Sequence, residues 1–161
     1  MYNFKGGQIT DSGVLQLVKG CPNILQLELS SPKITDDGVL HISKHCNKIE
    51  TIQLLSDKIT DASLRFLADG SQLSSFSLIR KGCKKLRKLS VLNAASITDE
   101  GLTVLAQGCS LLGMFESPLQ ITSELYKTLK EYCDCLSTSV VQEGIVEEEE
   151  PEDPNQVVDS T

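Results

Sequence analysis

An Ile-Thr dipeptide returns along this chain at a nearly constant spacing. The next residue is Asp in the first four copies, and a Cys follows the Ile by twelve residues in four of the five copies. The pairs are Ile9-Thr10, Ile34-Thr35, Ile59-Thr60, Ile97-Thr98 and Ile121-Thr122, and the cysteines are Cys21, Cys46, Cys109 and Cys133. Self-similarity over about 25 residues predicts a solenoid, in which supersecondary units stack on one another.

Each unit reads as a helix followed by a short strand. After Ile9 the apolar residues Val14, Leu17 and Val18 fall at helical spacing. The side chain of either Thr10 or Asp11 can accept hydrogen bonds from the free backbone N–H groups at the start of this helix. A strand with alternating apolar residues comes next. It occurs at Ile24-x-x-Leu27-x-Leu29, Ile49-x-x-Ile52-x-Leu54, Leu86-x-x-Leu89-x-Val91 and, more weakly, Leu112-x-x-Phe115-x-Ser117.

The alternation of Leu-x-x-Leu-x-Leu strands with Ile-Thr-Asp-x-Gly-Leu helices that end in Gly-Cys resembles the cysteine-containing leucine-rich repeats of the F-box/leucine-rich-repeat family. The resemblance covers residues 1–141. It implies an α/β leucine-rich-repeat solenoid, a short horseshoe with parallel strands on its concave face and helices on its convex face.

The same resemblance implies a protein-protein interaction domain like the substrate-recognition part of a Skp-cullin-F-box ubiquitin-ligase receptor, acting in ubiquitin-dependent protein degradation. The chain begins in mid-repeat, with Tyr2 and Phe4 at strand positions, and has no F-box. A Skp adaptor is therefore expected only if a longer form supplies one. Two alternatives stay open: an F-box-less adaptor or inhibitor of a regulatory protein, and a truncated, non-functional fragment.

The interval from Ile59 to Ile97 is 38 residues, where the neighbouring intervals are 25, 25 and 24. One explanation is a 12-residue insertion into the helical half of the unit. The other is a pair of units that have lost about 12 residues between them, with a strand at Leu73-x-x-Phe76-x-Leu78. The second explanation fits the residues better, and both predict irregular structure over 71–82.

The strand positions between the core residues are predicted to bind a protein partner on the concave face. These positions mix polar side chains with exposed apolar ones, and the alternative for each is ordinary solvated surface. They are Gln26, Glu28, Ser30, Thr51, Gln53, Leu55, Lys88, Ser90, Leu92, Met114 and Glu116, flanked by Asn3, Lys5 and Pro118.

Motifs for catalysis, cofactors and metals are missing from the sequence. There is no Gly-x-x-x-x-Gly-Lys, Gly-x-Ser-x-Gly or His-Glu-x-x-His, so we expect no enzyme activity, no cofactor and no metal. His41 and His45 lie beside Cys46, but a solvated helix end is the favoured interpretation. Cys83 lies among cations that would lower its pKa, although its repeat phase predicts burial. No apolar secretory segment precedes the repeats, so we expect reduced thiols in the cytoplasm or nucleus.

Charge divides the chain into two parts. Residues 142–161 hold eight acidic residues and no basic ones, which predicts a disordered acidic tail. The rest holds 15 basic and 14 acidic residues. Six cations crowd into nine residues, at Arg80, Lys81, Lys84, Lys85, Arg87 and Lys88. Without interleaved aromatic residues this run predicts a solvated repeat edge, either bare or contacted by the acidic tail, rather than a nucleic-acid site. Nothing in the sequence predicts a membrane.

Overall fold

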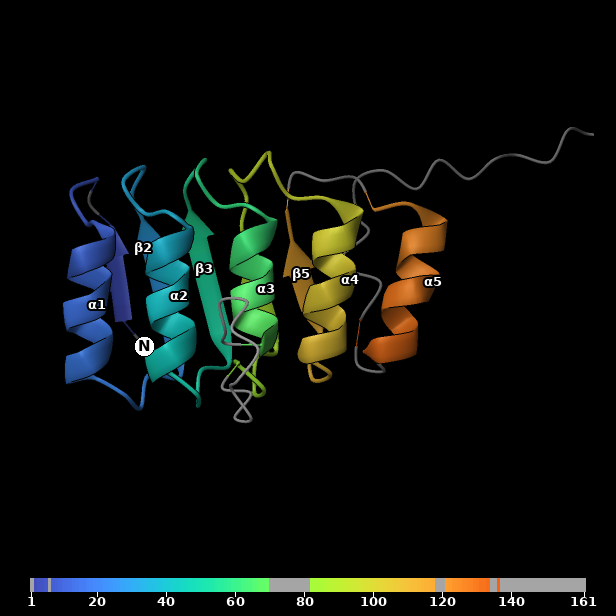
Figure 1. Cartoon of the computed structure of the whole chain (residues 1–161), viewed down its shortest axis with the longest axis horizontal. Coiled ribbons are helices and arrows are strands. Elements are labelled where there is room, and N and C mark those ends of the chain that lie inside the picture. The colour runs from blue at the N-terminus through green and yellow to red at the C-terminus, as the bar shows by residue number, and fades with distance from the viewer. Residues whose placement is uncertain (1, 6, 70–81, 118–120, 134–135, 137–161) are drawn as a thin grey trace, which may run out of the picture.

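The computed structural model describes residues 2–5, 7–69, 82–117, 121–133 and 136. Strand and helix alternate, and the five strands form one parallel sheet in sequence order. Figure 1 shows the helices as a single layer against one face of that sheet. The elements are β1 (Tyr2–Lys5), α1 (Asp11–Gly20), β2 (Gln26–Ser30), α2 (Asp36–His45), β3 (Thr51–Leu55), α3 (Asp61–Asp69), β4 (Lys88–Ser90), α4 (Asp99–Gly108), β5 (Met114–Glu116) and α5 (Ser123–Tyr132). The predicted α/β repeat solenoid is confirmed.

The core is a stack of equivalent apolar side chains between the sheet and the helices. Leu27 pairs with Ile52, Ile52 with Leu89, and Leu89 with Phe115, and all four are buried. Burying one such side chain stabilises the fold by about 1.5–3 kcal/mol. The strand phase predicted for the first residues is also confirmed, because Phe4 pairs with Leu29.

Thr, rather than Asp, caps the helices. In α1 the Oγ1 of Thr10 accepts a hydrogen bond from Gly13 N at 3.4 Å. Asp11 instead reaches the next unit, where its two carboxylate oxygens accept from Thr35 N at 2.9 Å and from Thr35 Oγ1 at 2.8 Å. We call this arrangement the Asp-Thr bridge. The Ile-Thr-Asp motif therefore joins units as well as starting helices.

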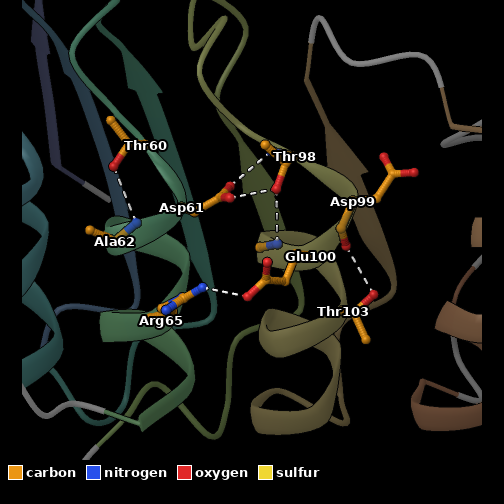
Figure 2. Close-up of polar contacts among 9 residues, drawn as sticks. Thr60, Asp61, Ala62, Arg65, Thr98, Asp99, Glu100 and Thr103 are labelled. Atoms are coloured by element: carbon orange, nitrogen blue, oxygen red, sulfur yellow. Dashed lines mark hydrogen bonds and ion pairs between the residues drawn. The ribbon is translucent and has the colours of Figure 1, made fainter. Parts of the chain in front are cut away.

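The Asp-Thr bridge recurs at the next two steps of the solenoid. Asp36 accepts from Thr60 N at 2.9 Å and from its hydroxyl at 2.7 Å. Asp61 accepts from Thr98 N at 2.8 Å and from its hydroxyl (Figure 2). Among the described residues, Asp99 makes no such bridge to the following unit. That step has the 24-residue interval, one residue shorter than the first two.

Small residues make room for the Asp-Thr bridge. A Cβ added to Gly38 would lie 2.5 Å from Asp11 Oδ1, and one added to Gly101 would lie 2.1 Å from Asp61 Oδ1. Ser63 stands at the equivalent position of α3, and its hydroxyl donates to Asp36. A small residue is thus required at Gly38, Ser63 and Gly101, where the Asp of the preceding unit approaches.

The long interval is a single repeat that carries an insertion. β3 pairs directly with β4, so no additional strand stands between them. Cys83 N donates to Leu67 O at 2.8 Å, just as Cys109 N donates to Leu105 O at 2.8 Å. Cys83 thus occupies the position in the repeat that the sequence spacing assigns to Ser71, which lies twelve residues earlier in the chain. The interpretation as two shortened units is wrong, because their second strand would have to separate β3 from β4.

Two sequence predictions fall outside the described residues. These are the irregular structure over 71–82, of which only Gly82 is described, and the disorder of the acidic tail. Leu136, the last described residue, is buried.

The cysteines behave as the repeat phase predicts. Cys46, Cys83, Cys109 and Cys133, which we call the cysteine ladder, are fully buried, and Cys21 is half-buried. Burial raises the pKa of Cys46 to about 11 and that of Cys109 to about 12. It also raises the pKa of Cys83, and neighbouring thiols add to the effect more than Lys84 opposes it. The reactive-thiol alternative for Cys83 is therefore wrong.

Candidate functional site

The sheet face opposite the helices gathers ten of the eleven predicted partner-binding residues. Alternate strand residues are buried against the helices, so the residues between them lie on the other side. We call this side the open face; it corresponds to the predicted concave face. Its residues are Gln26, Glu28 and Ser30 of β2, Thr51, Gln53 and Leu55 of β3, Lys88 and Ser90 of β4, and Met114 and Glu116 of β5, with Asn3 of β1 at the edge.

The eleventh residue, Leu92, does not belong to the open face. β4 ends at Ser90, and Leu92 lies in the turn that follows, with 45% of its surface exposed. The sequence suggests otherwise because the alternating pattern Leu86-x-x-Leu89-x-Val91 continues past the end of β4 to Val91. Leu92 is then the next position expected to face outward. Of the two flanking positions Lys5 and Pro118, the Lys5 backbone belongs to β1, whereas Pro118 falls outside the described residues.

Strand register arranges the open face in rows across the sheet. One row runs Gln26, Thr51, Lys88 and Met114, and the next runs Asn3, Glu28, Gln53, Ser90 and Glu116. Asn3 Nδ2 donates to Glu28 Oε2 at one end of the second row. At the other end Lys88 Nζ lies 3.1 Å from Glu116 Oε1. The rows thus present two carboxylates, one ammonium group and several amides on a rigid surface.

The Lys88–Glu116 pair is the main electrostatic feature of this face. Burial raises the pKa of Glu116, but the nearby Ser90 hydroxyl and the Lys88 ammonium together outweigh burial and hold it below its ordinary value. Ser90 is fully buried, and among the described residues its Oγ has no hydrogen-bond partner of regular geometry. Glu116 is therefore ionised at neutral pH, and this end of the face carries a fixed pattern of charge.

The hollow described on the open face is small. A hollow of about 50 Å³ lies over β1 to β3, lined by Tyr2, Gln26, Leu27, Glu28, Thr51 and Gln53. Sites for drug-sized ligands occupy about 300–1,000 Å³, so this hollow suits a protruding side chain of a partner better than a bound metabolite. Tyr2 pairs with the buried Leu27 and so has the strand phase of a core residue. It is 41% exposed because β1 is the first strand and has no described neighbour on its outer side.

The two histidines beside Cys46 make a contact within their own helix. His45 Nδ1 lies 2.9 Å from His41 O, within its own helix. No group of three metal-binding side chains occurs in the part of the chain that the structure describes. In the same part, no helix has the length and apolar character needed to cross a bilayer.

The basic run does not form one surface. Lys84 Nζ donates to the carbonyls of Ala68 and Gly108, at 2.7 and 2.8 Å, and so caps the ends of α3 and α4. Lys88 belongs to the open face. Lys85 and Arg87 are exposed, and Arg80 and Lys81 lie outside the described residues.

Comparison with solved structures identifies a shared fold. The structure described as Leiomodin-1 Actin-Binding Site 2 (ABS2) is similar with a TM-score of 0.60 and 15% sequence identity, over 83% of this chain and 78% of that one. The tropomodulin C-terminal domain of Caenorhabditis elegans is similar with a TM-score of 0.57 and 11% identity, over 80% of this chain and 78% of that one. No family model matches the chain, and no curated protein does either.

These comparisons correct one prediction and support another. Similarity to leiomodin and tropomodulin, with no matching family model, overturns the predicted place in the F-box/leucine-rich-repeat family. The motif behind that prediction has a packing explanation: Thr caps a helix, Asp bridges to the next unit and Cys fills the core. The leucine-rich-repeat type of solenoid is confirmed.

Proposed function

We propose that this chain is a protein-binding solenoid and that it binds its partner through the open face. The observation that carries the proposal is the face itself: five described strands in register, a small hollow, and the Lys88–Glu116 ion pair with apolar Met114 and Leu55 on the same face. Rigid surfaces that mix apolar and polar side chains suit protein partners.

Within this proposal, the chain acts as an adaptor or inhibitor that holds a regulatory protein. Binding rather than catalysis is favoured because both histidines lie in α2, on the far side of the sheet from the buried Ser90 hydroxyl. A serine nucleophile needs a base within hydrogen-bond reach. The ubiquitin-ligase role rested on the F-box resemblance and is not carried forward. We propose the cytoplasm or nucleus as the place of action, since the described cysteines are free thiols.

A charge exchange tests the open face without removing its ion pair. In this chain Lys88 Nζ and Glu116 Oε1 lie 3.1 Å apart, and Lys88→Glu combined with Glu116→Lys keeps opposite charges at the two positions but reverses their order. The matched control is Arg65→Glu with Glu100→Arg, which reverses the 2.7 Å pair between α3 and α4 on the helix layer (Figure 2). We expect the first exchange to weaken partner binding about tenfold or more and the control to leave it unchanged.

Actin is the first purified partner to assay, because one solved structure of similar fold is described as an actin-binding site. Binding is measured by cosedimentation and then by calorimetry with each exchange variant. The binding of any other partner identified by crosslinking to this chain is measured by calorimetry with the same exchange variants. A partner whose affinity falls with the helix-layer exchange, but not with the open-face exchange, would refute the proposed face.

A further inference from the structure

The two rims of the solenoid differ in their balance of charge. The helix starts share one rim, and all five helices carry an acidic residue in their first turn. The helix ends share the opposite rim, at the lower edge of Figure 1. We call this lower rim the αβ rim; it comprises the turns 21–25, 46–50, 82–87 and 109–113. These turns hold four exposed cations, Lys48, Lys84, Lys85 and Arg87, against one half-buried acid, Glu50.

The side chains of three of these cations have no partner among the described residues. Lys84 caps two helix ends, but the side chains of Lys48, Lys85 and Arg87 make no hydrogen bond or ion pair there. Lys48 and Lys85 each stand two residues after the cysteine of their unit, so they occupy equivalent places in adjacent units. Arg87 N donates to Glu50 O at 2.8 Å, which keeps Arg87 beside the start of β3. The three cations therefore form one cluster across two units.

The described part of the chain ends at the same rim. Leu136 is buried, and its N–H donates to Cys133 O at 3.1 Å. Leu112 and Leu86 make the same contact with Cys109 and Cys83, both at 2.9 Å. Leu136 thus stands two units beyond Leu86, a separation of about 10 Å at about 4.8 Å per strand.

The segment that follows can reach the cluster and matches its charge. Glu143 is seven residues beyond Leu136, a span of up to about 23 Å in extended chain. Between residues 143 and 159 the sequence has eight carboxylates and no Lys or Arg. The other rim, with its acidic helix starts, would repel such a segment.

We propose that the acidic segment 143–159 occupies the αβ rim of its own chain and pairs with Lys48, Lys85 and Arg87. The contact is between exposed charges, so it is screened by salt over about 8–10 Å at physiological ionic strength. It covers the rim and leaves the open face accessible, which makes it independent of the function proposed above.

Zero-length carbodiimide crosslinking of the full chain, followed by peptide mapping, tests this contact. Crosslinks join a lysine to a carboxylate only when the two meet. We expect the tail to crosslink to Lys48 and Lys85 about tenfold more than to Lys33 and Lys58, which are exposed lysines of the opposite rim. About 0.5 M salt should remove most of this preference. Equal yields at the two rims, or yields unaffected by salt, would overturn the proposal.

A charge variant separates attraction from mere proximity to the tail. Arg87→Glu should lower the tail crosslinks at Lys48 and Lys85 about threefold or more, because it reverses one charge of the cluster. Arg65→Glu makes the same change of charge on the exposed side of α3 and should leave them unchanged. Equal effects of the two variants would contradict the proposal. So would crosslinks that join light and heavy chains in an isotopically mixed sample, because these report contact between two molecules.

Discussion

The same substitution, Gly to Ala, should have opposite effects at two equivalent positions of this solenoid. Gly13 and Gly101 each stand two residues after the Asp of an Ile-Thr-Asp motif. At Gly101 the new Cβ would lie 2.1 Å from Oδ1 and 2.4 Å from Cγ of Asp61. At Gly13 the nearest atoms are 3.8 Å and 3.9 Å away, which is ordinary van der Waals contact. Only Gly101 receives a carboxylate from a preceding unit.

The magnitude follows from the contacts that must break. To make room at Gly101, Asp61 has to leave Thr98 and lose two hydrogen bonds to a charged acceptor, at about 1.5 kcal/mol each for a partly exposed site. Ala is a better helix former than Gly by about 1 kcal/mol. The net expectation is a loss of about 2 kcal/mol for Gly101→Ala and a gain of up to about 1 kcal/mol for Gly13→Ala.

Urea and thermal unfolding, followed by circular dichroism, would measure both changes. For a chain of this size each kcal/mol shifts the Tm by about 2–4 °C, so the two variants should differ by about 6–12 °C. The double variant Gly101→Ala with Asp61→Ala should cost less than the sum of its parts, since removing the carboxylate removes the clash. If both glycine variants shift stability in the same direction, the Asp-Thr bridge does not explain the motif.

Three further predictions rest on the same structure. Asp61→Asn should destabilise the fold by about 1–2 kcal/mol in urea unfolding, whereas Asp99→Asn, at the same place in a helix without a bridge, should change it by less than about 0.5 kcal/mol. The cysteine ladder should resist alkylation at neutral pH until the chain unfolds, because burial raises the pKa of Cys46, Cys83 and Cys109 and keeps these thiols protonated. Half-buried Cys21 should be modified before the ladder, and mass mapping that finds the ladder equally reactive would contradict this. NMR titration should place the pKa of Glu116 below its ordinary value. The ionised carboxylate then contributes stability above about pH 4.3, and this contribution is lost as pH falls through the lower folded-state pKa. Lys88→Met should raise the pKa of Glu116, and an unchanged titration would argue against the ion pair.

The positions of the candidate site were largely predictable, but its contacts were not. Alternation along a strand fixes which residues face away from the core, so Glu28, Gln53 and Glu116 could be placed from sequence. Leu92 could not, because the strand ends where the inter-strand hydrogen bonds end, and the apolar pattern runs beyond that point. Nor does spacing alone predict that Lys88 meets Glu116, a residue 28 positions away.

The 25-residue period by itself determined the solenoid, the order of helix and strand, and the burial of the cysteines. A period reports local geometry that repeats, and stacking identical geometries leaves one way to build a common core. The tertiary structure decided what the individual polar residues do. Asp11 bridges to Thr35 rather than capping its own helix, and Lys84 closes two helix ends. The direct pairing of β3 with β4 makes the long interval an insertion. Each of these depends on a partner about 16 to 40 residues away, which only the packing of neighbouring units brings into hydrogen-bond distance.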